Sequence, residues 1–372
     1  GAAVATPAAA GGPGGTSLQA QVAELQGRLD ALERERASGA NLSFGAWPGT
    51  EITVYGYVRG DFIFDQDANL GTTTFGISSR GAPGGTALTG NNNFQGHARQ
   101  SRLGIRSTTG TSMGDLSFRL EGDFFGSGNT TFRLRHAYGE LGGLKVGQTW
   151  TNFMPLHTLH ATVDFQGSSG VAFARQNQAR YTFDAGGGLT LSASIEDPLQ
   201  ASNDPVVTGV VKYGSDRFTV SGHFLGGQVN TAGPDDDAWG AILAGSANLW
   251  DGGTLQLTYG EGDGISSYIT SSGALDTVGN RALGVEVYTV GINQKINDQW
   301  SAGAYYGQTE HDRVAGVAPT GNRRVETVHA NVIYKPVENV SVGLEYFTGE
   351  RTDYSGASFD ADRVQSAVTF SF

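Results

Sequence analysis

From residue 51 to residue 372, apolar and polar side chains alternate within a series of strand-length segments. Successive side chains of a β-strand point to opposite faces, so each segment has one apolar face and one polar face. In the first segment the apolar face carries Ile52, Val54, Gly56, Val58, Gly60, Phe62 and Phe64. We count sixteen such segments, each bounded by turn-forming residues. This alternation predicts an all-β protein.

Short turns alternate with longer polar loops along the series. The short turns fall near residues 109–114, 142–143, 186–188, 214–215, 251–253, 297–298 and 337–339. An even number of antiparallel strands, with tight turns at one end and long loops at the other, is typical of bacterial outer-membrane proteins. We therefore predict a sixteen-stranded antiparallel transmembrane β-barrel over residues 51–372.

Alternation alone does not say which face points inward, because the strands of a soluble sandwich also alternate. The interior of a sixteen-stranded barrel is too wide for side chains to fill, so apolar side chains there would meet water. We expect the apolar face to point outward, toward lipid. Tryptophans at strand ends suit an aromatic belt at the membrane interface, and the candidates are Trp150, Trp239, Trp250 and Trp300.

The first 50 residues differ from the barrel. Residues 1–15 are mostly Ala, Gly and Pro and predict a flexible lead, and we expect that an export signal before them has been removed. An apolar heptad seam predicts a coiled-coil helix over 16–37, and residues 38–50 form a linker; the seam is Leu18, Val22, Leu25, Leu29 and Leu32. The helix either associates with copies of itself, as a trimer, or lies along its own chain.

Both ends of the barrel fall on the short-turn side, which is periplasmic in known barrels. The N-terminal helix is therefore expected in the periplasm, and the loops near 66–97 and 261–281 are expected to face outward. The formal net charge of −12 gives no basic footprint for nucleic acid. The chain has no cysteine, so disulfides and thiolate metal sites are excluded.

Arginines stand out on the polar faces of the early strands. By alternation we place seven of them on the inner wall: Arg59, Arg102, Arg106, Arg119, Arg133, Arg135 and Arg180. Neighbouring strands bring them together, and a cluster of guanidinium groups in a narrow pore favours anions. The alternative is that nearby acids, such as Asp61, Glu121 and Asp123, neutralise them in structural pairs.

The loop over 150–175 is long, aromatic and less polar than the other loops. We expect it to fold into the lumen and narrow the pore, with Asp164 across from the arginines; the alternative is that it packs on a neighbouring subunit or on the rim. The residues expected to form this constriction loop are Trp150, Asn152, Phe153, Met154 and Phe165.

Several stretches together resemble the DcaP-like trimeric porins: residues 99–105, 114–116, 120–125, 134–140, 146–154 and 163–165. The resemblance is dense over 51–185 and thinner beyond. It implies trimers of sixteen-stranded barrels with an N-terminal periplasmic coiled coil and an inward third loop. It also implies passage of small solutes that are often anionic, such as dicarboxylates. Within the matched stretches it covers Arg102, Arg106, Arg119, Arg133 and Arg135.

Catalytic and cofactor motifs are missing: no Gly-x-Ser-x-Gly elbow, phosphate loop or zinc spacing occurs. We predict a porin that is not an enzyme and needs no metal or cofactor. Its expected partners are two further copies, outer-membrane lipid and lipopolysaccharide, and small anionic solutes. Residues 235–237, three consecutive Asp, suit Ca²⁺, although a solvated loop tip is the simpler interpretation. Alternative functions are an outer-membrane tether or adhesin that uses the helix as its binding end, or a soluble all-β binding protein.

Overall fold

The computed structural model describes residues 40–41, 49–66, 68–83, 92–127 and 130–372. The predicted lead, the coiled-coil helix over 16–37 and most of the linker lie outside the described residues. Within the described part of the chain, no helix is long and apolar enough to cross a membrane.

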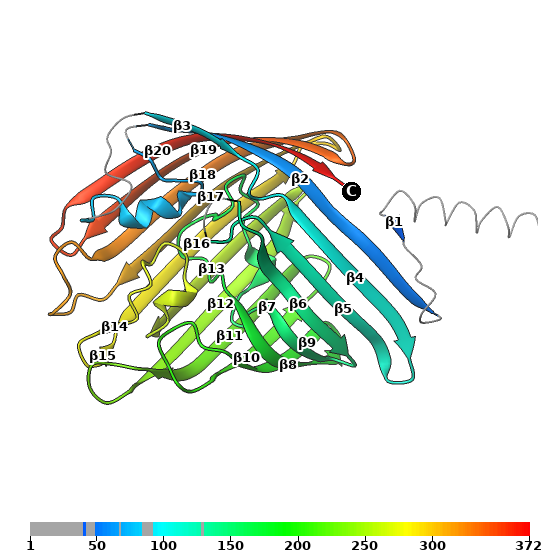
Figure 1. Cartoon of the computed structure of the whole chain (residues 1–372), viewed down its shortest axis with the longest axis horizontal. Coiled ribbons are helices and arrows are strands. Elements are labelled where there is room, and N and C mark those ends of the chain that lie inside the picture. The colour runs from blue at the N-terminus through cyan, green and yellow to red at the C-terminus, as the bar shows by residue number, and fades with distance from the viewer. Residues whose placement is uncertain (1–39, 42–48, 67, 84–91, 128–129) are drawn as a thin grey trace, which may run out of the picture.

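Sixteen strands of the described residues form one closed antiparallel barrel (Figure 1), which confirms the predicted fold. Each pairs with its neighbours in sequence, and the last pairs with the first. The strands are β2 (Thr50–Gln66), β4 (Arg102–Thr111), β5 (Gly114–Asp123), β6 (Arg133–Leu141), β7 (Leu144–Trp150), β8 (Arg175–Gly186), β9 (Leu189–Glu196), β10 (Val206–Gly214), β11 (Phe218–Val229), β12 (Asp236–Trp250), β13 (Gly253–Asp263), β16 (Gly284–Lys295), β17 (Trp300–His311), β18 (Asn322–Val337), β19 (Val340–Asp353) and β20 (Ser358–Ser371). Every short turn predicted from the sequence coincides with a tight connection between two of them.

The remaining elements are short. β1 (Ala40–Asn41) pairs with β2, and β3 (Asn93–His97) pairs with the loop-side half of β2, in line with β4. β14 (Thr277–Val278) and β15 (Arg281–Ala282) form a separate pair. In the described part of the chain, three 3₁₀ turns lie in the long loops: η1 (Thr74–Ser79), η3 (Leu156–Thr158) and η4 (Ser266–Tyr268).

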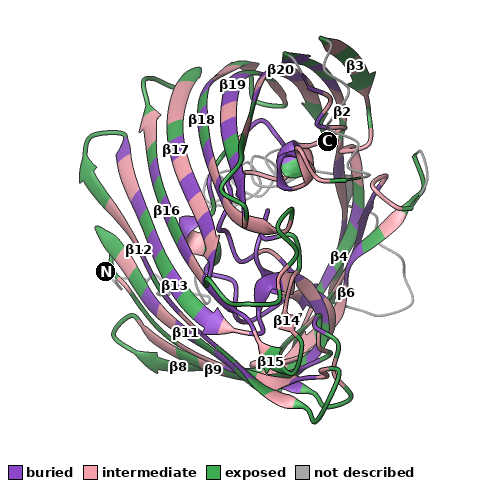
Figure 2. Ribbon diagram, turned by 90° about the vertical axis from the view of Figure 1, so that its left-hand side faces the viewer, coloured by how far each residue is buried: buried purple, intermediate pink, exposed green. Residues whose placement is uncertain are grey.

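Burial follows the predicted alternation. On β2, Val58 and Phe62 of the apolar face are 58% and 51% exposed, whereas Asp61 and Asp65 of the polar face are 1% and 0% exposed. The same contrast runs around the barrel (Figure 2). The apolar face therefore points outward and the polar face inward, as predicted.

The long loops differ from the expectation that they simply face outward. Figure 2 shows loop segments inside the ring of strands. Besides 151–174, parts of 68–83 and 264–283 turn inward, because each carries apolar residues that pack on inner-wall side chains. Ile77 of η1 is buried with Val325 and Phe347. Ile265 and Tyr268 are buried with Phe153 and with residues of β12 and β16.

The aromatic belt is also only partly as predicted. Trp239, Trp250 and Trp300 are exposed at strand ends on the outer surface. Trp150 instead packs against the guanidinium groups of Arg175 and Arg135, 4.6 Å and 5.6 Å from its ring. It belongs to the interior because its strand ends where the inserted loop begins.

Candidate functional site

An arginine cluster lines the inner faces of four neighbouring strands, β2, β4, β5 and β6. Its members are Arg59, Arg102, Arg106, Arg119, Arg133 and Arg135. All six were singled out from alternation. The cross-strand register brings them together: Arg106 pairs with Arg119, and Arg102 and Arg133 both pair with Asp123.

Two buried carboxylates on β5, Glu121 and Asp123, hold most of the arginine cluster. Glu121 contacts the guanidinium groups of Arg119 (2.5 Å), Arg135 (3.0 Å) and Arg102 (3.4 Å). Asp123 contacts those of Arg133 (2.8 Å) and Arg135 (2.7 Å). Four guanidinium groups thus share two carboxylates, so the contacts fix the arginines without cancelling their charge.

The other two members have different partners. Arg59 pairs with Asp61 at 2.7 Å and also donates to the backbone carbonyl of Val163 in the inserted loop. Arg106 lies over the ring of Tyr55, 5.8 Å from its centroid, and no ion pair joins it to an acid of the described residues. Arg106 therefore adds a charge that no ion pair neutralises.

Water in the lumen reaches some of these side chains and not others. Arg119 and Arg133 are 36% and 33% exposed, whereas Arg135 is 3% exposed. The Tyr55 hydroxyl accepts from Arg119 Nε at 2.7 Å and donates to Glu121 at 2.8 Å, which fixes the exposed guanidinium. Arg106 is exposed as well, so a passing solute can reach Arg106, Arg119 and Arg133.

A β-bulge in β6 adds a residue to the inner wall. Glu121 pairs with His136 and Gly122 pairs with Leu134, so Arg135 has no partner of its own across the ladder. Arg135 and His136 are consecutive and both are buried at the inner face, with His136 Nδ1 3.0 Å from Thr149 Oγ1. A bulge re-aims side chains in this way, and simple alternation cannot reveal it.

Residues 157–164 run around the inside of the wall from β13 to β20. The carbonyls of His157 and Leu159 accept from Gln256 of β13, and the Ala161 carbonyl accepts from Asn331 of β18. The loop thus follows the strands in order, as a band bound to the wall by hydrogen bonds. We call residues 157–164 the inner band.

The inner band is fixed most firmly at Glu345 of β19. This buried carboxylate accepts from the backbone N–H groups of Val163 (2.7 Å) and Asp164 (3.0 Å). It also accepts from Asn331 Nδ2 and lies 3.0 Å from His329 Nδ1. Hydrogen bonds to a charged acceptor are stronger than those between neutral groups.

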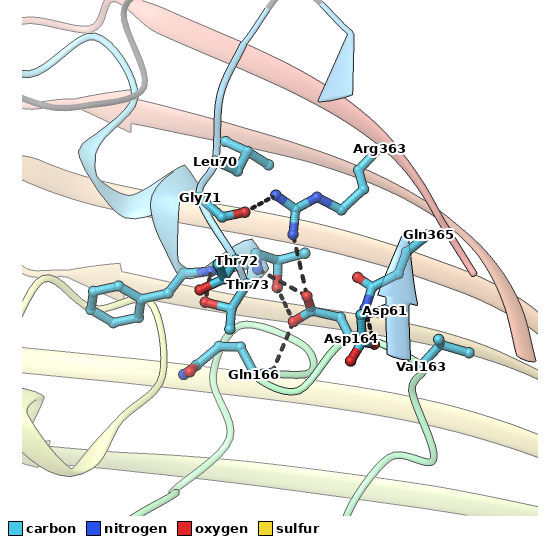
Figure 3. A network of polar contacts seen from close by, with 12 residues as sticks. Asp61, Leu70, Gly71, Thr72, Thr73, Val163, Asp164, Gln166, Arg363 and Gln365 are labelled. Carbon is cyan, nitrogen blue, oxygen red and sulfur yellow. Dashed lines mark hydrogen bonds and ion pairs between the residues drawn. The ribbon is translucent and has the colours of Figure 1, made fainter. Parts of the chain in front are cut away.

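Asp164 occupies a different place from the one predicted. It is 2% exposed and does not face the arginine cluster across open water. Its carboxylate accepts from the backbone and hydroxyl of Thr74 and from Arg363 of β20 at 3.3 Å (Figure 3). Arg363 also pairs with Asp65 at 2.6 Å. Asp164 therefore joins the inner band to η1 and to the barrel closure.

The residues expected to form the constriction have separate roles. Phe165 stacks on Phe125 at 4.4 Å and lies 5.5 Å from the guanidinium of Arg135, so it reaches the arginine cluster. Phe153 is fully buried in the apolar cluster, and Asn152 is held by Glu196 and by His223. Met154 lines a cavity together with Arg180, the seventh predicted arginine.

Four functional candidates were not singled out from the sequence: Arg175, Lys212, Glu345 and Arg363. Alternation in their strands places Lys212, Glu345 and Arg363 on the inner face, but nothing in the pattern says which inner positions contact a loop. Among the described residues, which include 235–237, no group of three or more His, Cys, Asp or Glu is arranged to hold a metal ion. Asp235 and Asp236 instead accept from Asn230 and from the Ala282 backbone.

Comparison with known proteins agrees with this geometry. The model of the family described as "DcaP outer membrane protein" matches residues 21–207. A search of the curated proteins found no match. Among solved structures, the outer membrane channel DcaP of Acinetobacter baumannii is 25% identical with a TM-score of 0.80, and the match covers 90% of this chain and 100% of that one.

Two further structures share the fold at lower identity. The anion-selective porin from Comamonas acidovorans is 14% identical with a TM-score of 0.64, covering 87% of this chain and 100% of that one. OmpT of Vibrio cholerae is 16% identical with a TM-score of 0.60, covering 90% of this chain and 100% of that one. These likenesses concern the barrel architecture alone.

Proposed function

The chain belongs to the DcaP outer membrane protein family, and from that premise we propose that it is a passive diffusion channel that prefers small anions, dicarboxylates among them. It has the fold of the outer-membrane porins. The channel performs no chemistry, and the concentration gradient of the solute drives transport.

One observation carries the anion preference. Five guanidinium groups of the inner wall are held by three carboxylates, those of Asp61, Glu121 and Asp123, and Arg106 is a sixth without an ion pair among the described residues. Arg keeps its charge at every relevant pH and presents a planar fork to carboxylates. The excess positive charge attracts anions, and water around Arg119 and Arg133 keeps the attraction shallow enough for release.

A solute enters at the loop end, passes between the exposed side of the arginine cluster and the inserted loop, and leaves at the short-turn end. We also propose, from the family, that the chain assembles as a homotrimer among outer-membrane lipid and lipopolysaccharide, with its N-terminal segment in the periplasm. The alternative of a tether or adhesin depends on residues 16–37, which lie outside the described residues, and no observation favours it.

Reversal potentials of the purified protein in planar bilayers under a potassium chloride gradient test the preference. We expect an anion-to-cation permeability ratio above one. Replacing Arg119 or Arg133 by Gln lowers it roughly two- to fivefold, as expected for a partly exposed charge worth about 0.4–1 kcal/mol.

Arg217→Gln is the matched control, because Arg217 is exposed in the short turn between β10 and β11, away from the arginine cluster. It should leave the ratio unchanged. A wild-type ratio at or below one would refute the anion preference, and an equal decrease in Arg217→Gln would show that the arginine cluster is not its source.

A further inference from the structure

A cavity of about 680 Å³ lies between the inner faces of β8–β11 and the start of the inserted loop. It extends to Gly188 and Gly214, which border short turns, and Met154 and His157 of the loop line its other side. The cavity therefore lies on the short-turn side of the loop, where a solute would pass after the loop.

Two basic side chains line this cavity, Arg180 of β8 and Lys212 of β10. Arg180 donates to Gln178 Oε1 at 2.8 Å and to the Trp150 carbonyl, both neutral acceptors. Lys212 is exposed to the lumen. Among the described residues neither forms an ion pair, and no acid lines the cavity. The arginine cluster, by contrast, is built around three carboxylates.

The lining of the cavity holds no group that cancels these charges. Burial lowers the pKa of His157, and the nearby Lys212 ammonium lowers it further, so this imidazole is neutral at neutral pH. The Glu196 carboxylate accepts from the Asn152 backbone at 2.8 Å and from the Ser194 hydroxyl at 2.6 Å. Glu196 and Glu140 both attract Arg180, but neither lines the cavity, so the lining holds two basic side chains and no acid.

The rest of the lining suits a small organic molecule. Thr182, Thr190 and Thr219 supply hydroxyl groups that donate to an anion, and Met154, Leu156 and Val210 supply an apolar side. Arg180 and Lys212 stand at different heights, since Arg180 pairs with Ser194, Ser194 with Thr208, and Lys212 lies four positions beyond Thr208 on β10. Two separated charges fit a molecule with two anionic ends.

We propose that this cavity is a binding site for small organic dianions, with Arg180 and Lys212 each holding one carboxylate and the apolar side contacting the chain between them. This rests on the proposed channel function and adds a step to it. The arginine cluster selects anions, and the cavity then holds them before release at the short-turn end.

Single-channel recording with butanedioate as the probe tests the site. In chloride solution, butanedioate should reduce the current in a saturable way. We expect Lys212→Gln and Arg180→Gln each to weaken the apparent affinity about threefold or more, which is the effect of losing one partly exposed charge contact. Butanoate, with a single carboxylate, should bind to the wild type more weakly than butanedioate. Its apparent affinity should also decrease by a smaller factor in the two variants.

Lys335→Gln is the matched control, because Lys335 is an exposed lysine of β18 that does not line the cavity. It should leave the butanedioate affinity unchanged. An affinity that does not fall in Lys212→Gln, or a wild-type current that shows no saturation, overturns the site.

The same recordings separate the site from the channel function. If the wild type prefers chloride under a salt gradient but butanedioate has no saturable effect, the proposed channel function stands and the proposed binding site is wrong. If the wild type prefers cations, the proposed anion preference is wrong, whatever the effect of butanedioate. Arg119→Gln should change the chloride preference and leave the butanedioate affinity unaltered, because Arg119 does not line the cavity.

Discussion

The two halves of the inner wall carry similar alternation but do different work. On β13 and β16–β20 the inner face is covered by the inner band and by η1, through groups such as Gln256, Asn331 and Glu345. On β2 and β4–β11 it holds the arginine cluster and the cationic cavity, and several of its guanidinium groups reach water. We call these the covered wall and the open wall.

The difference shows in residue type as well as in contacts. The covered wall uses glycines where the loop packs closely: Gly291 lies against the His160 side chain, Gly307 against the Ser169 backbone and Gly343 against the Val163 side chain. It binds the loop mainly through neutral side chains and the Glu345 carboxylate, with one buried cation, Arg363. The open wall uses cations. A side chain that points into the barrel therefore does not always line the pore, because many of the inward side chains bind the inserted loop instead.

Removing the acid that holds the inner band is the most severe test of the covered wall. Glu345→Ala leaves the N–H groups of Val163 and Asp164 and the side chain of His329 without their acceptor, and Asn331 keeps only the Ala161 carbonyl. Each unsatisfied buried donor costs roughly 1–3 kcal/mol, so the band should detach. We expect a larger, noisier single-channel conductance and a lower unfolding temperature.

The control is Glu350→Ala, which removes the same side chain from an exposed position on the same strand. It should change neither the conductance nor the unfolding temperature. If Glu345→Ala conducts like the wild type, the inner band does not depend on this carboxylate, and the contrast between the walls loses its main support.

Much of the barrel could be predicted because alternation is a local property. Strand number, short turns and the outward apolar face all follow from residues such as Val58 and Asp61 and from the glycine-rich turns. Contacts across the lumen could not be predicted in this way. Asp164 meets Arg363, 199 residues away, only because β20 closes on β2. Ile77 and Tyr268 lie in loops whose few apolar residues follow no regular spacing, so their inward packing has no periodic signal.

A smaller effect on stability is expected when a closely packed glycine of the covered wall is replaced by alanine. A Cβ at Gly307 would lie 2.1 Å from the backbone oxygen of Ser169, which no side-chain rotation relieves. Gly307→Ala should therefore displace the returning part of the loop and lower stability by roughly 1–3 kcal/mol, the usual cost of overpacking. Thermal unfolding in detergent measures it. Gly226→Ala on β11, where a Cβ has nothing within 4 Å, should be neutral; equal losses in both would show that Gly307 has no special role.

The smallest expected effect is that of low pH on stability, through a histidine of the inner band. His160 stacks on Tyr305 at 4.8 Å, and burial, with the nearby His329 adding to it, lowers its pKa from 6.5 to about 3. Below pH 6.5 the unfolded chain therefore binds a proton at this histidine, whereas the folded chain does not bind it until about pH 3. The free energy of unfolding therefore decreases as the pH falls from 6.5 to about 3. Between pH 6.5 and about 5.5 one such histidine costs about 1 kcal/mol. The unfolding temperature of His160→Gln should decrease less over this interval than that of the wild type. Equal decreases would mean that His160 is protonated in place and that acid acts on the covered wall elsewhere.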